Sequence, residues 1–294
     1  MLFLAATIIL TSYLTLSFKM LQRFNISNLQ AIVFNYLTCV IVGSIVNGSV
    51  PFNNHMVFEP WFLWACIMGI TFVLLFNLIA YTTQKMGVAV ASVANKLSLV
   101  IPFSFSLYLY NETSSWVKIV GIILALTAVV LTCWPKRKTE TKSLQSISPL
   151  MWILLPTILF LGSGFLDTMI KYVEQSFINE QNNNAYLITA FAVAFVSGFI
   201  IMIILFLKKK EKFDRRSILA GILIGIPNYF SIWFLLAVLK QHPGNSSAII
   251  PIVNMGIVLF SSVMAWLIFK EILSVKNWVG ILLSLAAISL IAYG

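Results

Sequence analysis

Ten apolar stretches, each about as long as a membrane is thick, restrict the fold of this sequence more than any other feature. A helix needs about 20 largely apolar residues to cross the hydrocarbon core of a bilayer. The stretches cover residues 2–18, 28–47, 61–83, 87–110, 116–134, 150–173, 185–207, 216–239, 246–269 and 275–293. Only 10% of the residues are charged, whereas a soluble domain has about 25%. We therefore expect an all-α membrane protein with ten transmembrane helices and short polar loops.

The basic residues are distributed unevenly between the two ends of these predicted helices. The loops after the first, third, fifth, seventh and ninth helices hold fifteen Lys and Arg residues, and the opposite ends hold three. Lys and Arg in short loops mark the cytoplasmic side of a membrane. We therefore expect both termini outside the cytoplasm, and the basic loops need no nucleic acid partner to explain them. Lys19 and Arg23 follow the first apolar stretch instead of preceding it, which predicts a retained helix and not a cleaved signal peptide.

The two halves of the chain contain similar segments. Residues 112–129 and 271–288 align without gaps and share eight of eighteen positions, among them the pair Gly121 and Gly280. The same offset aligns Asn95 with Asn254, and a weaker match pairs Lys19 with Lys171. We interpret residues 1–134 and 150–294 as two five-helix repeats joined by a basic cytoplasmic linker, 135–149.

An odd number of helices in each repeat has a consequence for topology. The second repeat must enter the membrane from the opposite side, which makes a 5+5 inverted-topology repeat. Such repeats place a substrate site between two pseudo-equivalent halves and expose it to each side in turn. The architecture therefore favours a secondary transporter.

Three segments give the chain a family resemblance. They are "SFKM" at residues 17–20, "YNETSSWVKIVGIILALTAVVL" at 110–131 and "FKEILSVKNWVGILLSLAAISLI" at 269–291. The chain resembles the drug/metabolite transporter (DMT) superfamily, EamA-like branch, in which an acidic residue ends the fourth and ninth helices and a glycine follows in the next helix. The resemblance implies a transporter in a bacterial inner membrane and leaves open whether it carries amino acids, sugars, nucleotide sugars or drugs. Many relatives keep both termini in the cytoplasm, contrary to the charge distribution here, and the first helix lacks the glutamate with which the small multidrug-resistance relatives bind cations.

Lys96 is the most unusual residue within the apolar stretches. Nine residues at a rise of 1.5 Å place it about 14 Å from the cytoplasmic end of its helix, close to the middle of the bilayer. A charge at that depth costs at least ~2.5 kcal/mol and marks a functional site by default. Lys96 either attracts an anionic or zwitterionic substrate, carries a coupled proton after losing its charge, or bonds carbonyl groups for structural reasons.

Few acids are available to pair with Lys96. Asp167 lies about 27 Å from the cytoplasmic end of the sixth helix by the same count, so a direct pair requires a tilt or a kink, which Pro156 could supply. Asp167 and Lys171 are one turn apart and favour a local salt bridge. We predict that Lys19, Asp167 and Lys171 act in gating or coupling, with Lys19 at the cytoplasmic rim of the cavity and Lys171 at the outer rim.

Polar and aromatic residues within the helices complete the predicted substrate site. Amides buried in lipid need partners, which interhelical hydrogen bonds supply in the simplest interpretation. The pair Asn95 and Asn254 recurs in both repeats beside prolines, and the segment "GIPNYFSIW" at 225–233 combines a proline with polar and aromatic groups on one helix face. The predicted substrate-binding residues are Lys96, Asn95, Asn254, Asn228, Tyr229, Trp233, Asn77 and Asn35.

Other functions lack supporting motifs. The three cysteines and two histidines show no metal-ligand spacing, and the chain contains no HExxH, GxSxG or phosphate-binding loop. These absences disfavour an enzyme and predict no cofactor or metal. A lipid or drug exporter or flippase on the same fold, and a channel, stay open as alternatives. We expect membrane lipid and a small-molecule substrate as partners, in a monomer or a homodimer.

Overall fold

The computed structural model describes residues 2–52, 55–102, 116–132, 134, 148–177, 182–241, 246–271 and 273–293. Within them the chain is all-helical, as expected, with one short 3-10 helix and no strand. The α-helices are α1 (Leu2–Arg23), α2 (Asn28–Asn47), α3 (Phe62–Met86), α4 (Val88–Leu97), α6 (Trp116–Thr132), α7 (Pro149–Phe177), α8 (Asn183–Leu207), α9 (Arg216–Gln241), α10 (Ser246–Phe269) and α11 (Val275–Tyr293). Each corresponds to one predicted stretch.

The described helices are suited to a membrane by length and composition. Seven are long and apolar enough to cross one, and shorter apolar helices cover Val88–Pro102, Ile119–Thr132 and Val275–Ile291. A helix satisfies its own backbone groups, which lipid cannot do. The prediction of a multi-pass, all-helical membrane protein is therefore confirmed at this level.

The chain divides into two compact units, neither of which coincides with a half of the sequence. Unit 1 consists of Met1–Lys19, Leu78–Asp167 and Ser231–Gly294, and unit 2 consists of Met20–Asn77 and Thr168–Phe230. Each unit thus draws helices from both predicted repeats. The residues of α1, α3, α7 and α9 are divided between the units.

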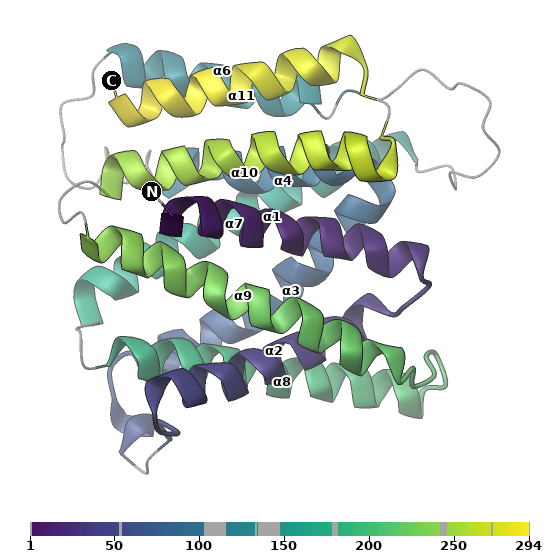
Figure 1. Ribbon diagram of the computed structural model, residues 1–294, viewed down its shortest axis with the longest axis vertical. Coiled ribbons are helices and arrows are strands. Elements are labelled where there is room, and N and C mark those ends of the chain that lie inside the picture. Colours follow the sequence, from purple (N-terminus) through teal and green to yellow (C-terminus); the bar gives the residue numbers. More distant parts are fainter. Residues whose placement is uncertain are drawn as a thin grey trace. The chain divides into compact units, whose positions relative to one another are not determined.

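Close packing of α6 against α11 organises unit 1, and the two helices lie side by side (Figure 1). A methyl group placed on Gly121 of α6 would lie 2.9 Å from Ile291 Cγ1 and 3.2 Å from the carbonyl oxygen of Ala287. A methyl group on Gly280 of α11 would lie 2.5 Å from the amide nitrogen of Thr132 and 3.0 Å from the carbonyl oxygen of Ala128. Glycine is required at both positions because the two backbones approach so closely.

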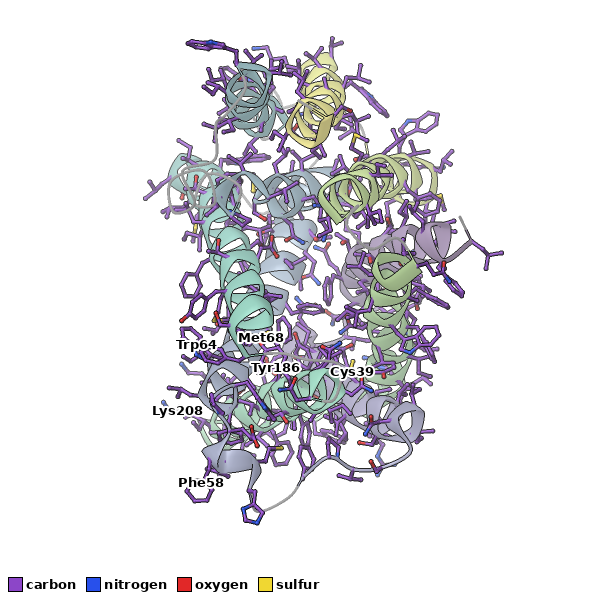
Figure 2. All side chains as sticks on the ribbon, turned by 90° about the vertical axis from the view of Figure 1, so that its left-hand side faces the viewer. Cys39, Phe58, Trp64, Met68, Tyr186 and Lys208 are labelled. Carbon is purple, nitrogen blue, oxygen red and sulfur yellow. The ribbon has the colours of Figure 1, made fainter. Side chains whose placement is uncertain are left out.

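Unit 2 is built around the pairing of α2 with α8 (Figure 1). Tyr36 is fully buried, and its ring lies 6.1 Å from that of Phe191 and 6.3 Å from that of Phe72. Figure 2 shows Tyr186 beside Met68, where the tyrosine hydroxyl donates to the methionine sulfur at 3.2 Å. Burial of these aromatic side chains fixes the helices of unit 2.

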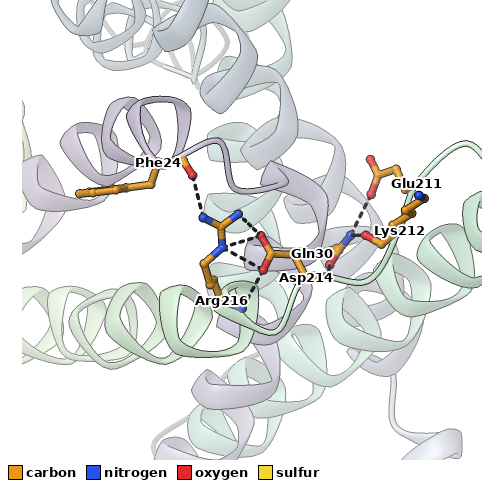
Figure 3. Close-up of polar contacts among 6 residues, drawn as sticks. All are labelled: Phe24, Gln30, Glu211, Lys212, Asp214 and Arg216. Carbon is orange, nitrogen blue, oxygen red and sulfur yellow. Dashed lines mark hydrogen bonds and ion pairs between the residues drawn. The ribbon is translucent and has the colours of Figure 1, made fainter.

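The loop between α8 and α9 is fastened to the first turn of α2 (Figure 3). Gln30, which is 1% exposed, donates from Nε2 to Glu211 Oε2 at 3.2 Å and accepts from the amide of Asp214 at 3.0 Å. Arg216 forms an ion pair with Asp214 at 2.8 Å. Hydrogen bonds from Arg216 lower the pKa of the Asp214 carboxyl. This basic loop is therefore held in place by its own polar contacts.

Candidate functional site

A break in the fourth span is the feature from which the site is built. The sequence predicts one span over 87–110 with a kink site at Pro102. In the structure α4 ends at Leu97, and a turn covers Ser98 and Leu99 before helical structure resumes at Val100. Residues 103–110 lie outside the described part of the chain. Pro102 explains the break, because it has no amide hydrogen to donate to the carbonyl of Ser98. That carbonyl accepts from the amide of Ile101 at 2.9 Å instead.

Lys96 lies in the last turn of α4, directly before this break. The carbonyl groups at the C-terminal end of a helix carry a partial negative charge, which favours a cation there. The Lys96 side chain is half-buried. The break therefore supplies part of the stabilisation that a lysine in an apolar span requires.

Asp167 of α7 lies beside Lys96, within unit 1. Its carboxylate and the Lys96 ammonium interact electrostatically without forming a direct ion pair. The Ser98 hydroxyl lies 3.2 Å from Asp167 Oδ2 and 2.5 Å from the carbonyl oxygen of Asn95. A hydroxyl has one hydrogen, so Ser98 donates to one of these acceptors at a time.

The depth count from the sequence placed Asp167 too far from Lys96, and the length of α7 explains the error. The helix has 29 residues, which is about 43 Å, whereas the hydrocarbon core is about 30 Å thick. The count assumed that α7 begins at the membrane edge and runs straight across, whereas a helix about 13 Å longer than the core can tilt. A tight kink at Pro156 is not required.

The surroundings of Asp167 leave polar groups available to a ligand. Asp167 is exposed although it lies within an apolar span, and lipid does not solvate a carboxylate. One turn earlier on the same face, Ser163 is 3% exposed and its hydroxyl has no hydrogen-bond partner. Asp167 and Ser98 thus place polar groups beside Lys96, and Ser163 adds a hydroxyl one turn earlier on α7.

Three other predicted substrate-binding residues belong to unit 1: Asn95, Asn254 and Trp233. Asn95 and Asn254 are both half-buried. Ser261 of α10 donates to Ser92 of α4 at 2.9 Å, and continuing this antiparallel register places Asn254 level with Leu99, in the break. Trp233 instead packs edge-on against Phe3, with ring centroids 6.4 Å apart.

The remaining four predicted substrate-binding residues lie in unit 2. Asn228 donates to Asn35 Oδ1 at 3.2 Å and to the sulfur of Cys39 at 3.6 Å, and Tyr229 is buried beside this pair. Asn77 donates to the carbonyl of Val73 at 2.9 Å within its own helix. A structural role fits these contacts, although Asn35 Nδ2 is buried without a partner.

A second polar cluster was not predicted from the sequence. Lys19 of α1 forms an ion pair with Glu271 at 3.6 Å and donates to the carbonyls of Thr83 and Gln84 at 3.4 Å. Both carboxylate oxygens of Glu271 accept from the amide of Val88, the first residue of α4, at 3.1 and 3.2 Å. Glu271 is the acidic residue that ends the ninth helix in the family resemblance. No pattern in the neighbouring sequence indicated its contacts with Lys19 or α4. The side chain of Lys171 lies outside the described part, so its predicted role is untested.

Glu271 also lines a cavity of about 390 Å³ at the junction of α10 and α11. The other lining residues are Trp266, Leu267, Lys270, Leu273 and Trp278. Among the described residues, no group of His, Cys, Asp and Glu side chains is placed to hold a metal ion.

Comparison with known proteins agrees with the resemblance stated from the sequence. Residues 150–293 match the EamA-like transporter family. An uncharacterized protein of Haemophilus influenzae is 26% identical over 282 residues, which cover 94% of this chain and 92% of the relative.

Proposed function

We propose that this chain, a member of the EamA-like transporter family, is a secondary transporter that moves a small zwitterionic metabolite, such as an amino acid, across the membrane. The observation that carries this proposal is the proximity of Asp167 to both Lys96 and Ser98 at the break in α4. A lysine alone favours an anion. A lysine and a carboxylate at one site favour a substrate that carries both charges.

The chemistry of the site assigns a role to each residue. Lys96 attracts the substrate carboxylate, because an ammonium group in a low-dielectric site interacts strongly with an opposite charge. Asp167 attracts the substrate ammonium group, and Ser98 holds the Asp167 carboxylate in place. Broken helices beside polar groups are typical of transporter binding sites.

Reciprocal contacts between the halves support the proposed 5+5 inverted repeat. The offset that aligns Gly121 with Gly280 also aligns Ala128 with Ala287. Gly121 approaches Ala287, and Gly280 approaches Ala128. Contacts that are exchanged in this way are expected for two copies related by a two-fold axis. Two such halves allow alternating access, which is the mechanism we propose.

Ligand-dependent thermal unfolding of the purified protein tests the substrate class. An amino acid, its N-acetyl derivative and its methyl ester would be compared, beside sugars, nucleotide sugars, cationic drugs and lipids. A ligand at about 100 times its Kd adds about 2.7 kcal/mol of stability, which corresponds to a rise in Tm of about 5–10 °C for a protein of this size. We expect the zwitterion to raise Tm and the two blocked forms to have little effect.

Three variants connect the response to the site. Lys96→Met and Asp167→Asn should each lose the rise in Tm, because each removes one of the two charges. Lys276→Met is the matched control, since this exposed lysine lies over the Trp134 ring and should keep the full response. An equal response in Lys96→Met, or stabilisation only by sugars, drugs or lipids, would contradict the proposal. Counterflow of the stabilising compound in proteoliposomes then tests transport itself.

A C-terminal reporter fusion tests the predicted orientation separately. The distribution of basic residues places both termini outside the cytoplasm. A reporter active only in the cytoplasm would overturn the orientation and would leave the substrate class unaffected.

A further inference from the structure

The geometry points to Glu271 as a positioning residue that holds the start of α4 in place and so keeps the site at Lys96 closed toward one side of the membrane. Lys19 holds the Glu271 carboxylate in place. This inference deepens the proposed transport function and rests on it. It assigns to Glu271 the control of access to the site at Lys96, from the side of the membrane on which α4 begins.

The cluster joins four helix ends through side chains. The amide of Val88, at the start of α4, shares its one hydrogen between the two carboxylate oxygens of Glu271, just after α10. Lys19, in the fifth turn of α1, pairs with Glu271 and also donates to two carbonyls at the end of α3. A carboxylate at a helix N-terminus is stabilised by the partial positive charge there. Glu271 is thus the polar group that links the start of α4 to both α1 and α10, beside the apolar contact of Val88 with Leu16 and Ala265. Its loss would weaken the hold on the start of α4.

The connection between α3 and α4 is built to admit this carboxylate. Gly87 is the only residue between the two helices, and its φ of 104° is a conformation that other residues rarely adopt. A methyl group on Gly87 would lie 2.8 Å from Glu271 Oε2. Glycine is thus required at this position for two reasons: the backbone conformation and the close approach of Glu271.

The cavity beside Glu271 would give its carboxylate an alternative position. The cavity of about 390 Å³ that it lines contains Lys270, a second cation, and the rings of Trp266 and Trp278. A carboxylate released from Lys19 and Val88 would find space and an opposite charge in this cavity. An element with two accessible arrangements is what a conformational switch requires.

The released element is the one that carries the substrate groups. Lys96 lies eight residues after Val88 on the same short helix, and Ser98 directly follows that helix. A shift of the start of α4 therefore changes access to these groups without altering them. Opening of the site toward this side requires the Glu271 contacts to break, and closing restores them.

Thiol labelling from each side of the membrane tests this inference without a known substrate. Asn95→Cys, in a background without Cys39, Cys66 and Cys133, places a thiol beside Lys96. Its reaction rate with a membrane-impermeant cationic methanethiosulfonate is measured in right-side-out and inverted vesicles. We expect Glu271→Ala to increase the ratio of the rate from the α4 N-terminal side to the rate from the opposite side by at least tenfold.

Companion variants separate access from stability. Glu271→Gln keeps the acceptor for Val88 and loses the charge pair, so its ratio should rise less than that of Glu271→Ala. Lys19→Met should shift the ratio in the same direction, and it decides the test if Glu271→Ala fails to fold. Arg216→Gln breaks the ion pair in unit 2 and should leave the ratio unchanged. A lower Tm with an unchanged ratio in the Glu271 and Lys19 variants would overturn the inference, whereas the absence of any transported substrate would count against the proposed function alone.

Discussion

Substitution of Gly280 by alanine should destabilise the protein, although alanine is the better helix former. In an exposed helix the change from glycine to alanine stabilises by about 1 kcal/mol. At Gly280 the added methyl group would lie 2.5 Å from the amide nitrogen of Thr132 and 3.0 Å from the carbonyl oxygen of Ala128. Both atoms belong to the backbone of α6 and cannot rotate away, so the two helices must separate.

The magnitude follows from the balance of these two effects. Overpacking costs typically about 1–3 kcal/mol, and the obstruction by backbone atoms places this site at the upper end. After the gain in helix propensity, the net loss is about 2 kcal/mol, which corresponds to a fall in Tm of about 4–8 °C. Gly121→Ala should cost less, because its methyl group would meet a side-chain atom of Ile291 at 2.9 Å and backbone only at 3.2 Å.

In a background without Cys66 and Cys133, unfolding can be followed with a dye that fluoresces on reaction with Cys39, which is fully buried in the native protein. Ala286→Gly is the control, since Ala286 is on the exposed face of the same helix. It should lower stability by about 1 kcal/mol through helix propensity alone. A Tm for Gly280→Ala at or above the wild-type value would refute the reasoning, because propensity would then outweigh the helix contact.

Three further predictions concern single polar groups. Ser98→Ala should raise the Kd of a stabilising ligand about tenfold in Tm titrations, because a hydrogen bond to a charged group contributes about 1.5 kcal/mol or more. A double-mutant cycle with Asn35→Leu and Asn228→Leu should give a coupling energy of about 0.6–1.7 kcal/mol in the Tm assay, and zero coupling would refute their hydrogen bond. Asp214→Asn should lower Tm at neutral pH. Because the folded-state pKa of Asp214 is lowered by Arg216, its contribution is complete above the unfolded pKa of about 3.9 and is lost as pH falls through the folded pKa. The Tm values of wild type and variant should converge there, and a difference that persists would contradict this assignment.

The spans were predictable because each depends on local composition. Ten apolar runs predicted ten helices, and the boundaries agree within a few residues except at the ends of α1, α4 and α7. The break after Leu97 could be assigned to Pro102 but not located from the sequence, because Pro102 acts on a carbonyl four residues earlier and the apolar pattern continues across it. The division into units was not predictable, since it depends on which helices pack together.

Part of the candidate site could be chosen from the sequence. Lys96 and Asp167 stand out as charges within apolar spans, but their proximity depends on how α4 and α7 pack. The contacts of Glu271 could not be predicted from the sequence, because its partners Lys19 and Val88 lie more than 180 residues away in the chain. Contacts of that kind leave no periodic signal in one sequence.

The pairing of Lys96 with Asp167 also bears on the electrical behaviour of the carrier. One positive and one negative group give the site no net charge, and a zwitterionic substrate adds none. Moving one elementary charge across the membrane involves about 2.3 kcal/mol for each 100 mV, and a neutral complex avoids this work in both directions. Exchange of a zwitterion should therefore be electroneutral, with a rate that does not respond to an imposed membrane voltage.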